Sequence, residues 1–86
     1  MENVIRLHPD DNVATASRAI PAGAPIVGAG RGLTAAGEIP YGHKVALVEI
    51  AQGGRIVKYG EAIGAATARI APGELVHSHN LGALEP

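Results

Sequence analysis

The chain contains no cysteine, phenylalanine or tryptophan, and it has only two tyrosines among its 86 residues. The lack of cysteine excludes disulfides and thiolate zinc sites, which often reinforce small domains. Hydrophobic residues still make up 47 % of the sequence, so the core must be built from aliphatic side chains. We expect one domain over residues 1–86 with a thin core, stabilised by aliphatic packing or by a partner subunit.

An excess of charge of one sign is also missing. Seven basic and eight acidic residues give a net charge of −1, which does not favour binding to nucleic acid. The uncharged stretches are short and interrupted by proline and glycine, so no membrane span is expected. The opening residues Met1-Glu2-Asn3 lack the pattern of a signal peptide, and we therefore expect a cytoplasmic location.

Glycine and proline are abundant, with 12 and 6 residues, and the glycines recur in a pattern. The unit Ile-x-x-Gly-x-x-(Ile/Val) occurs four times, at residues 20–26, 39–45, 50–56 and 70–76. Glycine adopts backbone conformations closed to other residues, so each unit predicts a tight turn between two core aliphatics. Four such turns leave no room for a long helix, and the sequence predicts a small all-β domain.

Five segments rich in aliphatic and β-branched residues are predicted as strands: residues 4–8, 13–19, 45–50, 55–59 and 74–79. A short helical turn at 17–20 is the alternative for the end of the second segment.

Glycine-rich residues 24–34 predict a hairpin or loop. They lack the sequence context of a phosphate-binding loop, including Gly-Lys-Ser/Thr. We expect the core to span residues 4–81 and residues 82–86 to form a loose tail.

Histidines offer the first candidate chemistry. If His77-Ser78-His79-Asn80 continues a strand, His77 and His79 project from one face and could share a metal ion or flank a substrate. The alternative is a solvated strand end without a special role. His43 lies in the second turn unit beside Lys44, and His8 is expected at the surface.

The segment Lys58-Tyr59-Gly60 closes a predicted strand. Lys58 could pair with a carboxylate of a ligand, and Tyr59 could offer its hydroxyl group. The alternative is an exposed lysine beside a half-buried aromatic ring. No Ser-His-Asp arrangement, carboxylate pair or EF-hand loop can be assembled. Composition and spacing therefore lead to a small all-β domain with a candidate polar cluster.

Several motifs occur together in the order found in one known family. They are Asp11-Asn12-Val13-Ala14, Gly42-His43-Lys44, Lys58-Tyr59-Gly60 and Val76-His77-Ser78-His79-Asn80. Over about residues 4–81 the chain resembles the SAF-type (antifreeze-protein-like) small domain of the altronate and galactarate dehydratases. The resemblance implies a β-clip fold, in which a long bent hairpin folds over on itself. It also implies a separate small subunit, or the N-terminal part of a longer dehydratase.

Members of that family remove water from sugar acids to give 2-keto-3-deoxy acids. They are associated with a divalent metal, for which Fe²⁺ is expected and Mn²⁺ is the alternative. The resemblance implies a lyase that works with a large catalytic subunit, which can itself hold most of the metal ligands. We do not expect the chain to be active alone. It lacks the acidic ligands expected around a hard divalent ion, and it has too little volume for an enclosed pocket that would hold a sugar acid.

The resemblance also assigns candidate residues. The candidates for catalysis are His43, His77 and His79, of which His77 and His79 are also candidate metal ligands. The candidates for substrate binding are Lys44, Lys58, Tyr59 and Asn80.

Two alternatives stay open. The small subunit of sulfolactate sulfo-lyase, a relative built the same way that expels sulfite, is the first. A non-catalytic module that binds carbohydrate or plugs the large subunit is the second, and ice binding is disfavoured because the chain has only three threonines. The substrate, the metal and the oligomeric state, including a homo-oligomer, are not decided by the sequence.

Overall fold

The structure, a computed structural model, describes residues 1–30 and 32–84. Its strands are β1 (Val4–Ile5), β2 (Val13–Ala16), β3 (Lys44–Ala46), β4 (Arg55–Lys58), β5 (Glu61–Ala66), β6 (Leu75–Val76) and β7 (Leu81–Gly82). No helix occurs among the described residues, so none there could cross a membrane. The all-β prediction is confirmed. The helical turn given as the alternative at 17–20 does not form; the chain bends at residues 17–18 instead.

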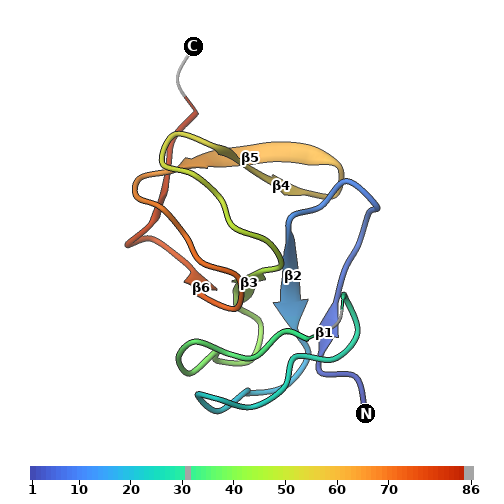
Figure 1. Cartoon of the computed structure of the whole chain (residues 1–86). Helices are drawn as coiled ribbons and strands as arrows, with labels where there is room; N and C mark the ends of the chain where they lie inside the picture. Colours follow the sequence, from blue (N-terminus) through green and yellow to red (C-terminus); the bar gives the residue numbers. More distant parts are fainter. Residues whose placement is uncertain (31, 85–86) are drawn as a thin grey trace.

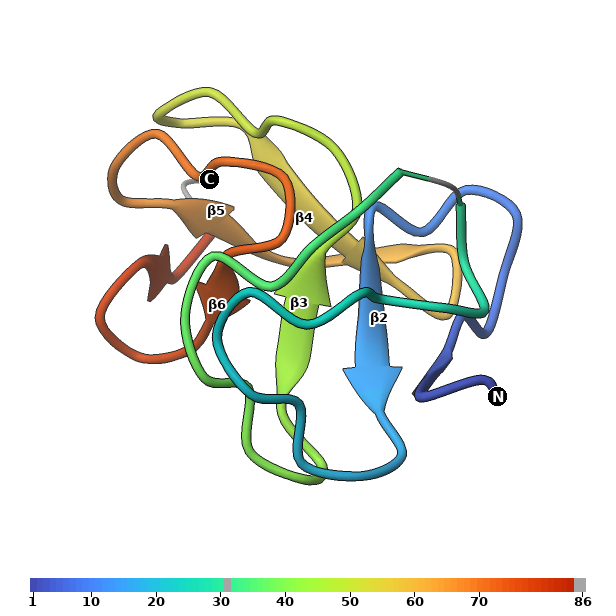
Figure 2. The ribbon, with the colours of Figure 1, turned by 60° about the horizontal axis from the view of Figure 1, so that its bottom comes forward.

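The strands form two antiparallel sheets, in the orders β1-β2-β3-β6 and β4-β5-β7. In Figure 1 the second sheet lies across the top of the molecule, above the start of β2. Figure 2 shows the connection between β2 and β3 folded back across the face of both strands. The first sheet is therefore covered on one face by this connection and on the other by the second sheet.

Each face of the first sheet has its own core. Because successive side chains alternate, Ala14 and Val45 enter one cluster, whereas Val13 and Ala46 enter the other. The first cluster is Val4, Ala14, Ala16, Ile20, Ile26, Ala35, Ile39, Val45 and Leu47. The second cluster, called core 2 below, is Val13, Ala46, Ile50, Ile56, Ala66, Ile70 and Val76. The central strands are thus buried on both sides, and aliphatic side chains alone fill the core.

The four glycine units form turns, as predicted. Their glycines have φ between 82° and 86°, and in each unit the turn is closed by a backbone hydrogen bond, such as that from Ala24 N to Pro21 O (3.1 Å). A glycine with positive φ at the third position is the mark of a type II turn. The four isoleucines are at most 4 % exposed.

The units associate in two pairs. Ile20 and Ile39 exchange two backbone hydrogen bonds, and so do Ile50 and Ile70, all at 2.8–2.9 Å. In addition, the glycine N–H of each unit donates a hydrogen bond to the carbonyl oxygen of an alanine in the partner unit. This alanine lies four residues before the isoleucine of that partner unit. These four bonds, all 2.8 Å long, join Gly23 to Ala35, Gly42 to Ala16, Gly53 to Ala66 and Gly73 to Ala46. The full unit is therefore Ala-x-x-x-Ile-x-x-Gly-x-x-(Ile/Val), and its buried alanine leaves room for the partner's turn.

Strand β5 was not predicted, although it is the longest strand of the structure. Its sequence, Glu-Ala-Ile-Gly-Ala-Ala, is poor in the residues that favour strands. It forms because β4 and β7 pair with its two edges. A Cβ atom on Gly64 would clash with the Leu81 side chain, so glycine permits the close approach of β7.

Other predicted boundaries need correction. The predicted strands at 4–8 and 45–50 end early, at Ile5 and Ala46. The loose-tail prediction is wrong at Gly82, which pairs with Ala65 in the β5–β7 ladder, while residues 85–86 lie outside the described residues. The predicted hairpin at 24–34 is confirmed by the Pro25–Thr34 bridge, although Arg31 lies outside the described residues.

The turn units make a test of the fold possible with two matched variants. At Gly23 and Gly73 φ is nearly the same (82° and 86°), but an added Cβ meets nothing within 4 Å at Gly23 and the carbonyl oxygen of Thr34 at Gly73. We expect Gly23→Ala to lower the free energy of unfolding by about 1–2 kcal/mol, the cost of a left-handed alanine. Gly73→Ala should cost about 1–3 kcal/mol more, because the clash is added. Urea unfolding followed by circular dichroism measures both, and equal losses would contradict the turn packing.

Candidate functional site

Two histidines from distant segments lie side by side. The register of β3 and β6 pairs Lys44 with Val76, which places His43 and His77 next to each other just beyond the ladder. Their ring centroids are 4.7 Å apart and the ring planes are tilted by 53°. His43 is half-buried and His77 is exposed. The pair therefore offers two imidazoles that a single ligand can contact from the open side.

The strand predicted through His79 is wrong beyond Val76. Residues 77–80 form a turn, closed by the hydrogen bond from Asn80 N to His77 O (3.0 Å). The cause is the side chain of Asn80, only 3 % exposed, whose Oδ1 accepts from His77 N (2.9 Å) and whose Nδ2 donates to Leu75 O (2.8 Å). His77 and His79 thus do not follow one strand face, and His79 lies exposed in the turn.

Two lysines mark the edge of core 2. Lys44 lies two residues before Ala46 on β3, and Lys58 lies two residues after Ile56 on β4. Residues two apart share one face of a strand, so each lysine side chain lies on the face that also carries a residue of core 2. Both are half-buried. Burial and the positive charge of Lys58 lower the pKa of Lys44. The ion pairs in the described part of the chain, His8–Asp10 and Arg69–Glu49, include neither lysine. The two ammonium groups therefore leave positive charge available to an anion.

Tyr59 follows Lys58 at the tip of the β4–β5 hairpin. Its side chain is 64 % exposed, and the Lys58 Nζ atom lies 5.4 Å from its ring centroid. The exposure is the reverse of the alternative considered for this segment, because the lysine is half-buried and the aromatic ring is not.

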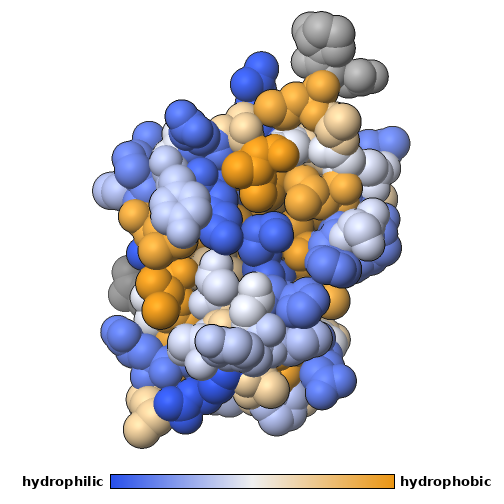
Figure 3. Space-filling model, turned by 180° about the vertical axis from the view of Figure 1, so that it is seen from behind, coloured by the Kyte–Doolittle hydropathy of each residue, from blue (hydrophilic) through white to orange (hydrophobic). Residues whose placement is uncertain are grey.

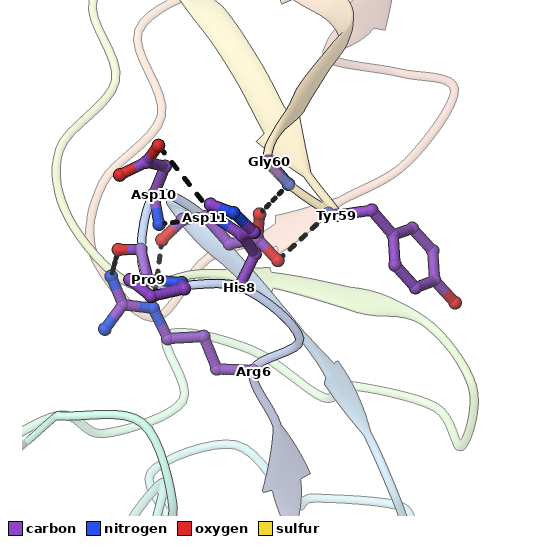
Figure 4. A network of polar contacts seen from close by, with 7 residues as sticks. All are labelled: Arg6, His8, Pro9, Asp10, Asp11, Tyr59 and Gly60. Atoms are coloured by element: carbon purple, nitrogen blue, oxygen red, sulfur yellow. Dashed lines mark hydrogen bonds and ion pairs between the residues drawn. The ribbon is translucent and has the colours of Figure 1, made fainter.

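Asp11 organises this tip, a role that the sequence did not reveal. The residue is 3 % exposed. Its Oδ1 accepts from Gly60 N (2.8 Å) and its Oδ2 accepts from Tyr59 N (3.1 Å), as Figure 4 shows. The next residue, Asn12, binds β4 in the same way, since its Oδ1 accepts from Val57 N (2.8 Å) and its Nδ2 donates to Arg55 O (2.9 Å). The consecutive Asp11 and Asn12 side chains fasten the second sheet to the start of β2.

The environment of Asp11 shifts its acidity. Burial raises the pKa of this carboxyl, but the hydrogen bonds from Gly60 and Tyr59, together with the charge of His8, outweigh burial and lower the pKa below its ordinary value of 3.8. A lowered pKa in the folded state means that ionised Asp11 stabilises the fold at neutral pH. That contribution is lost as the pH falls through the pKa of the folded state.

The described residues do not fit a complete metal centre. Imidazole nitrogens are good ligands for divalent transition metals, and His43 and His77 could supply two. Within residues 1–30 and 32–84, however, no three histidine, aspartate or glutamate side chains are grouped so that they could hold an ion. The Fe²⁺ or Mn²⁺ expected from the family resemblance would need further ligands from outside the described residues.

Comparison with protein families decides the relationship. The family model described as the altronate/galactarate dehydratase SAF domain matches residues 2–84. The chain belongs to this family. The family predicted from the sequence motifs is thus confirmed, and the two antiparallel sheets agree with the fold of a small all-β SAF domain.

Individual relatives support the same family assignment. The chain is 41 % identical over 76 residues to altronate dehydratase of Escherichia coli (strain K12), and 40 % identical over 80 residues to altronate dehydratase of Bacillus subtilis (strain 168). These matches cover 88 % and 93 % of this SAF domain, but only 15 % and 16 % of the dehydratases. The chain therefore spans about a sixth of their length. It is also 46 % identical over 48 residues, 56 % of its length, to (2R)-sulfolactate sulfo-lyase subunit alpha of Paracoccus pantotrophus, of which it covers 72 %.

The hydrogen bonds that Asp11 accepts from Tyr59 N and Gly60 N predict that the stability of the domain depends on pH. Asp11→Asn keeps the shape of the side chain but leaves an amide N–H₂ group facing a backbone N–H. We expect this variant to unfold at a lower temperature than the natural chain at pH 7. The difference in unfolding temperature between Asp11→Asn and the natural chain should narrow only as the pH falls below about 3.8, where the natural carboxylate also becomes protonated. Thermal unfolding between pH 7 and 3, followed by circular dichroism, measures this.

Asp10→Asn is the matched control, because the Asp10 side chain is 77 % exposed. Its unfolding temperature should follow that of the natural chain. A constant difference between Asp11→Asn and the natural chain at every pH would contradict the role of the ionised carboxylate.

Proposed function

We propose that this SAF domain acts as the small subunit or domain of a sugar-acid dehydratase of the altronate/galactarate type. It completes an active site on a large catalytic polypeptide and takes part in eliminating water to give a 2-keto-3-deoxy acid. The observation that carries the proposal is the contact between His43 and His77, which the fold assembles from two segments beside Lys44. Membership of the dehydratase family supplies the class of reaction.

A large partner is part of the proposal for two reasons. The altronate dehydratases that match are about six times as long as this chain. The candidate residues also lie on the outside of the domain rather than in an enclosed pocket; His77, His79 and Tyr59 are exposed. Figure 3 shows apolar side chains exposed among polar ones on the face opposite Figure 1, as expected of a surface that a partner covers in part.

The residues suit an elimination. A base must remove the proton from the carbon beside the carboxylate, and an acid must protonate the leaving hydroxyl group so that it departs as water. The resulting enol then rearranges to the 2-keto acid. Imidazole can perform either proton transfer near neutral pH, so we assign these steps to His43 and His77. His79, in the same turn as His77, stays a candidate for the same role.

The lysines suit the charge of the substrate. Lys44 and Lys58 can pair with the carboxylate. Lys44, next to His43 in the chain, can also stabilise the negative charge that develops as the proton leaves. Tyr59 can add a hydrogen bond from its hydroxyl group. Asn80, whose amide binds Leu75 and His77, would act on the substrate chiefly by holding the turn that carries His77. We propose that the divalent metal, Fe²⁺ or Mn²⁺, is held mainly by the large polypeptide.

A sulfolactate sulfo-lyase is the second candidate function. The observation that favours it is the 46 % identity over 48 residues to the sulfo-lyase subunit alpha. The same site would serve, because the substrate again loses a proton beside a carboxylate. The leaving group would be sulfite, which departs without the protonation that hydroxide needs.

The complex tests these assignments. We expect the domain, purified together with its large polypeptide, to release a 2-keto-3-deoxy acid from altronate or galactarate, and the isolated domain to release none. His77→Ala and His43→Ala should each lower kcat about 100-fold or more, the usual contribution of general acid–base catalysis. Size-exclusion chromatography checks that each variant still assembles.

Ser78→Ala, in the same turn, is the matched control and should keep its full activity. Unchanged turnover of both histidine variants in an intact complex would instead indicate a structural plug. Sulfite released from sulfolactate, without dehydration of sugar acids, would favour the sulfo-lyase. Dehydration by the isolated domain would contradict the shared site.

A further inference from the structure

The tip of the β4–β5 hairpin holds an unfavourable backbone conformation. Lys58 pairs with Glu61, so Tyr59 and Gly60 form a two-residue turn with φ of 58° and 75°. Tyr59 is the one residue other than glycine with a positive φ in the described ranges 1–30 and 32–84. Such turns favour Asn-Gly or Gly-Gly, and a bulky aromatic residue is strained at this position. Strain of this kind persists only where the surroundings enforce it, and it occurs most often at functional sites.

Contacts with the loop between β1 and β2 hold the Tyr59-Gly60 turn in this conformation. As Figure 4 shows, Asp11 accepts hydrogen bonds from both N–H groups of the strained turn, Tyr59 N and Gly60 N. Arg6 in turn fixes the loop, since its Nε donates to Asp11 O (3.2 Å) and its guanidinium also donates to Pro9 O. The His8 ring packs against the turn so closely that a Cβ atom on Gly60 would lie 2.9 Å from it. The tip is thus fixed by a buried carboxylate and a packed ring.

The fold gains nothing visible from the tyrosine side chain at this position. Its ring points away from the network in Figure 4 and is 64 % exposed. What the conformation does achieve is placement: the Lys58 Nζ atom lies over the Tyr59 ring, 5.4 Å from its centroid, so an ammonium group lies beside a residue that carries a phenol hydroxyl. Both are donors, and together they suit one oxyanion group such as a carboxylate or a sulfonate.

We propose that Asp11 is a positioning residue that holds the Tyr59-Gly60 turn in its strained conformation, so that Lys58 and Tyr59 bind the acid group of the substrate. This inference rests on the proposed function, because the ligand is the carboxylate of the sugar acid or the corresponding group of sulfolactate. Asp11 itself stays buried behind the turn and contacts only the backbone of the tip.

The first part of the test measures the strain. Tyr59→Gly and Tyr59→Asn accept a positive φ, so each should raise the unfolding temperature of the domain. Asp11→Asn should lower it, and by more when combined with Tyr59→Asn, because only the tyrosine turn can release strain when the hydrogen bonds to Asp11 are lost. The unfolding temperatures of the natural domain, Asp11→Asn, Tyr59→Asn and the double variant form a double-mutant cycle, and Tyr59→Gly is measured beside them. A lower unfolding temperature for Tyr59→Gly would overturn the inference.

The second part measures substrate binding by the complex with altronate, galactarate and sulfolactate. Asp11→Asn and Lys58→Met should each raise KM about tenfold, as expected for one lost charged contact, with kcat within about twofold. Adding Asp11→Asn to Lys58→Met should raise KM further by less than tenfold, since only the Tyr59 contact is then left to be misplaced. A purely structural role would instead lower the active fraction, and hence kcat, in both backgrounds. Asp10→Asn is the control and should leave both constants unchanged.

If Asp11→Asn does not fold, Tyr59→Gly decides the question, because it should give a more stable domain whose complex has a higher KM. An unchanged KM in that variant, or a loss of assembly with the large polypeptide in place of a higher KM, would overturn the positioning role alone. A natural complex that turns over none of the three acids would overturn the proposed function together with this inference.

Discussion

The pairing of the turn units is the interaction on which this small domain depends. Each unit buries an isoleucine and places a glycine with positive φ against an alanine of its partner, so that backbone hydrogen bonds run in both directions. The arrangement works without aromatic residues or disulfides because it satisfies backbone groups and buries aliphatic side chains in the same step. It also keeps the strands short, since the chain reverses direction at every unit.

The same pairing places the candidate site. His43 lies in the second unit and His77 directly follows the fourth, and the β3–β6 ladder brings them into contact. The lysines lie at the edge of core 2, where the apolar rows of β3 and β4 end. A second set of contacts, from the Asp11 and Asn12 side chains to β4 and the following turn, fixes the hairpin that carries Lys58 and Tyr59. Charged and polar groups of the site are thus held by backbone contacts rather than by a deep core.

This construction agrees with the lengths of the relatives. The SAF domain corresponds to about a sixth of the altronate dehydratases but to most of a sulfo-lyase subunit. A domain that carries its candidate residues on its outer edges can serve either as part of a longer chain or as a separate polypeptide, because under the proposed function a second surface closes the site in both cases.

The sequence by itself determined the turns, the all-β class and the family, because a glycine that must have positive φ and an isoleucine that must be buried leave a regular spacing in the chain. The tertiary structure decided the rest. Strand β5 exists through its neighbours and not through the strand preference of alanine and glycine. The turn at 77–80 replaces a strand because the Asn80 amide binds the backbone of its own loop. The contact of His43 with His77, and that of Asp11 with a turn 48 residues away, depend on strand pairing, and no local pattern in a single sequence records which distant segments pair.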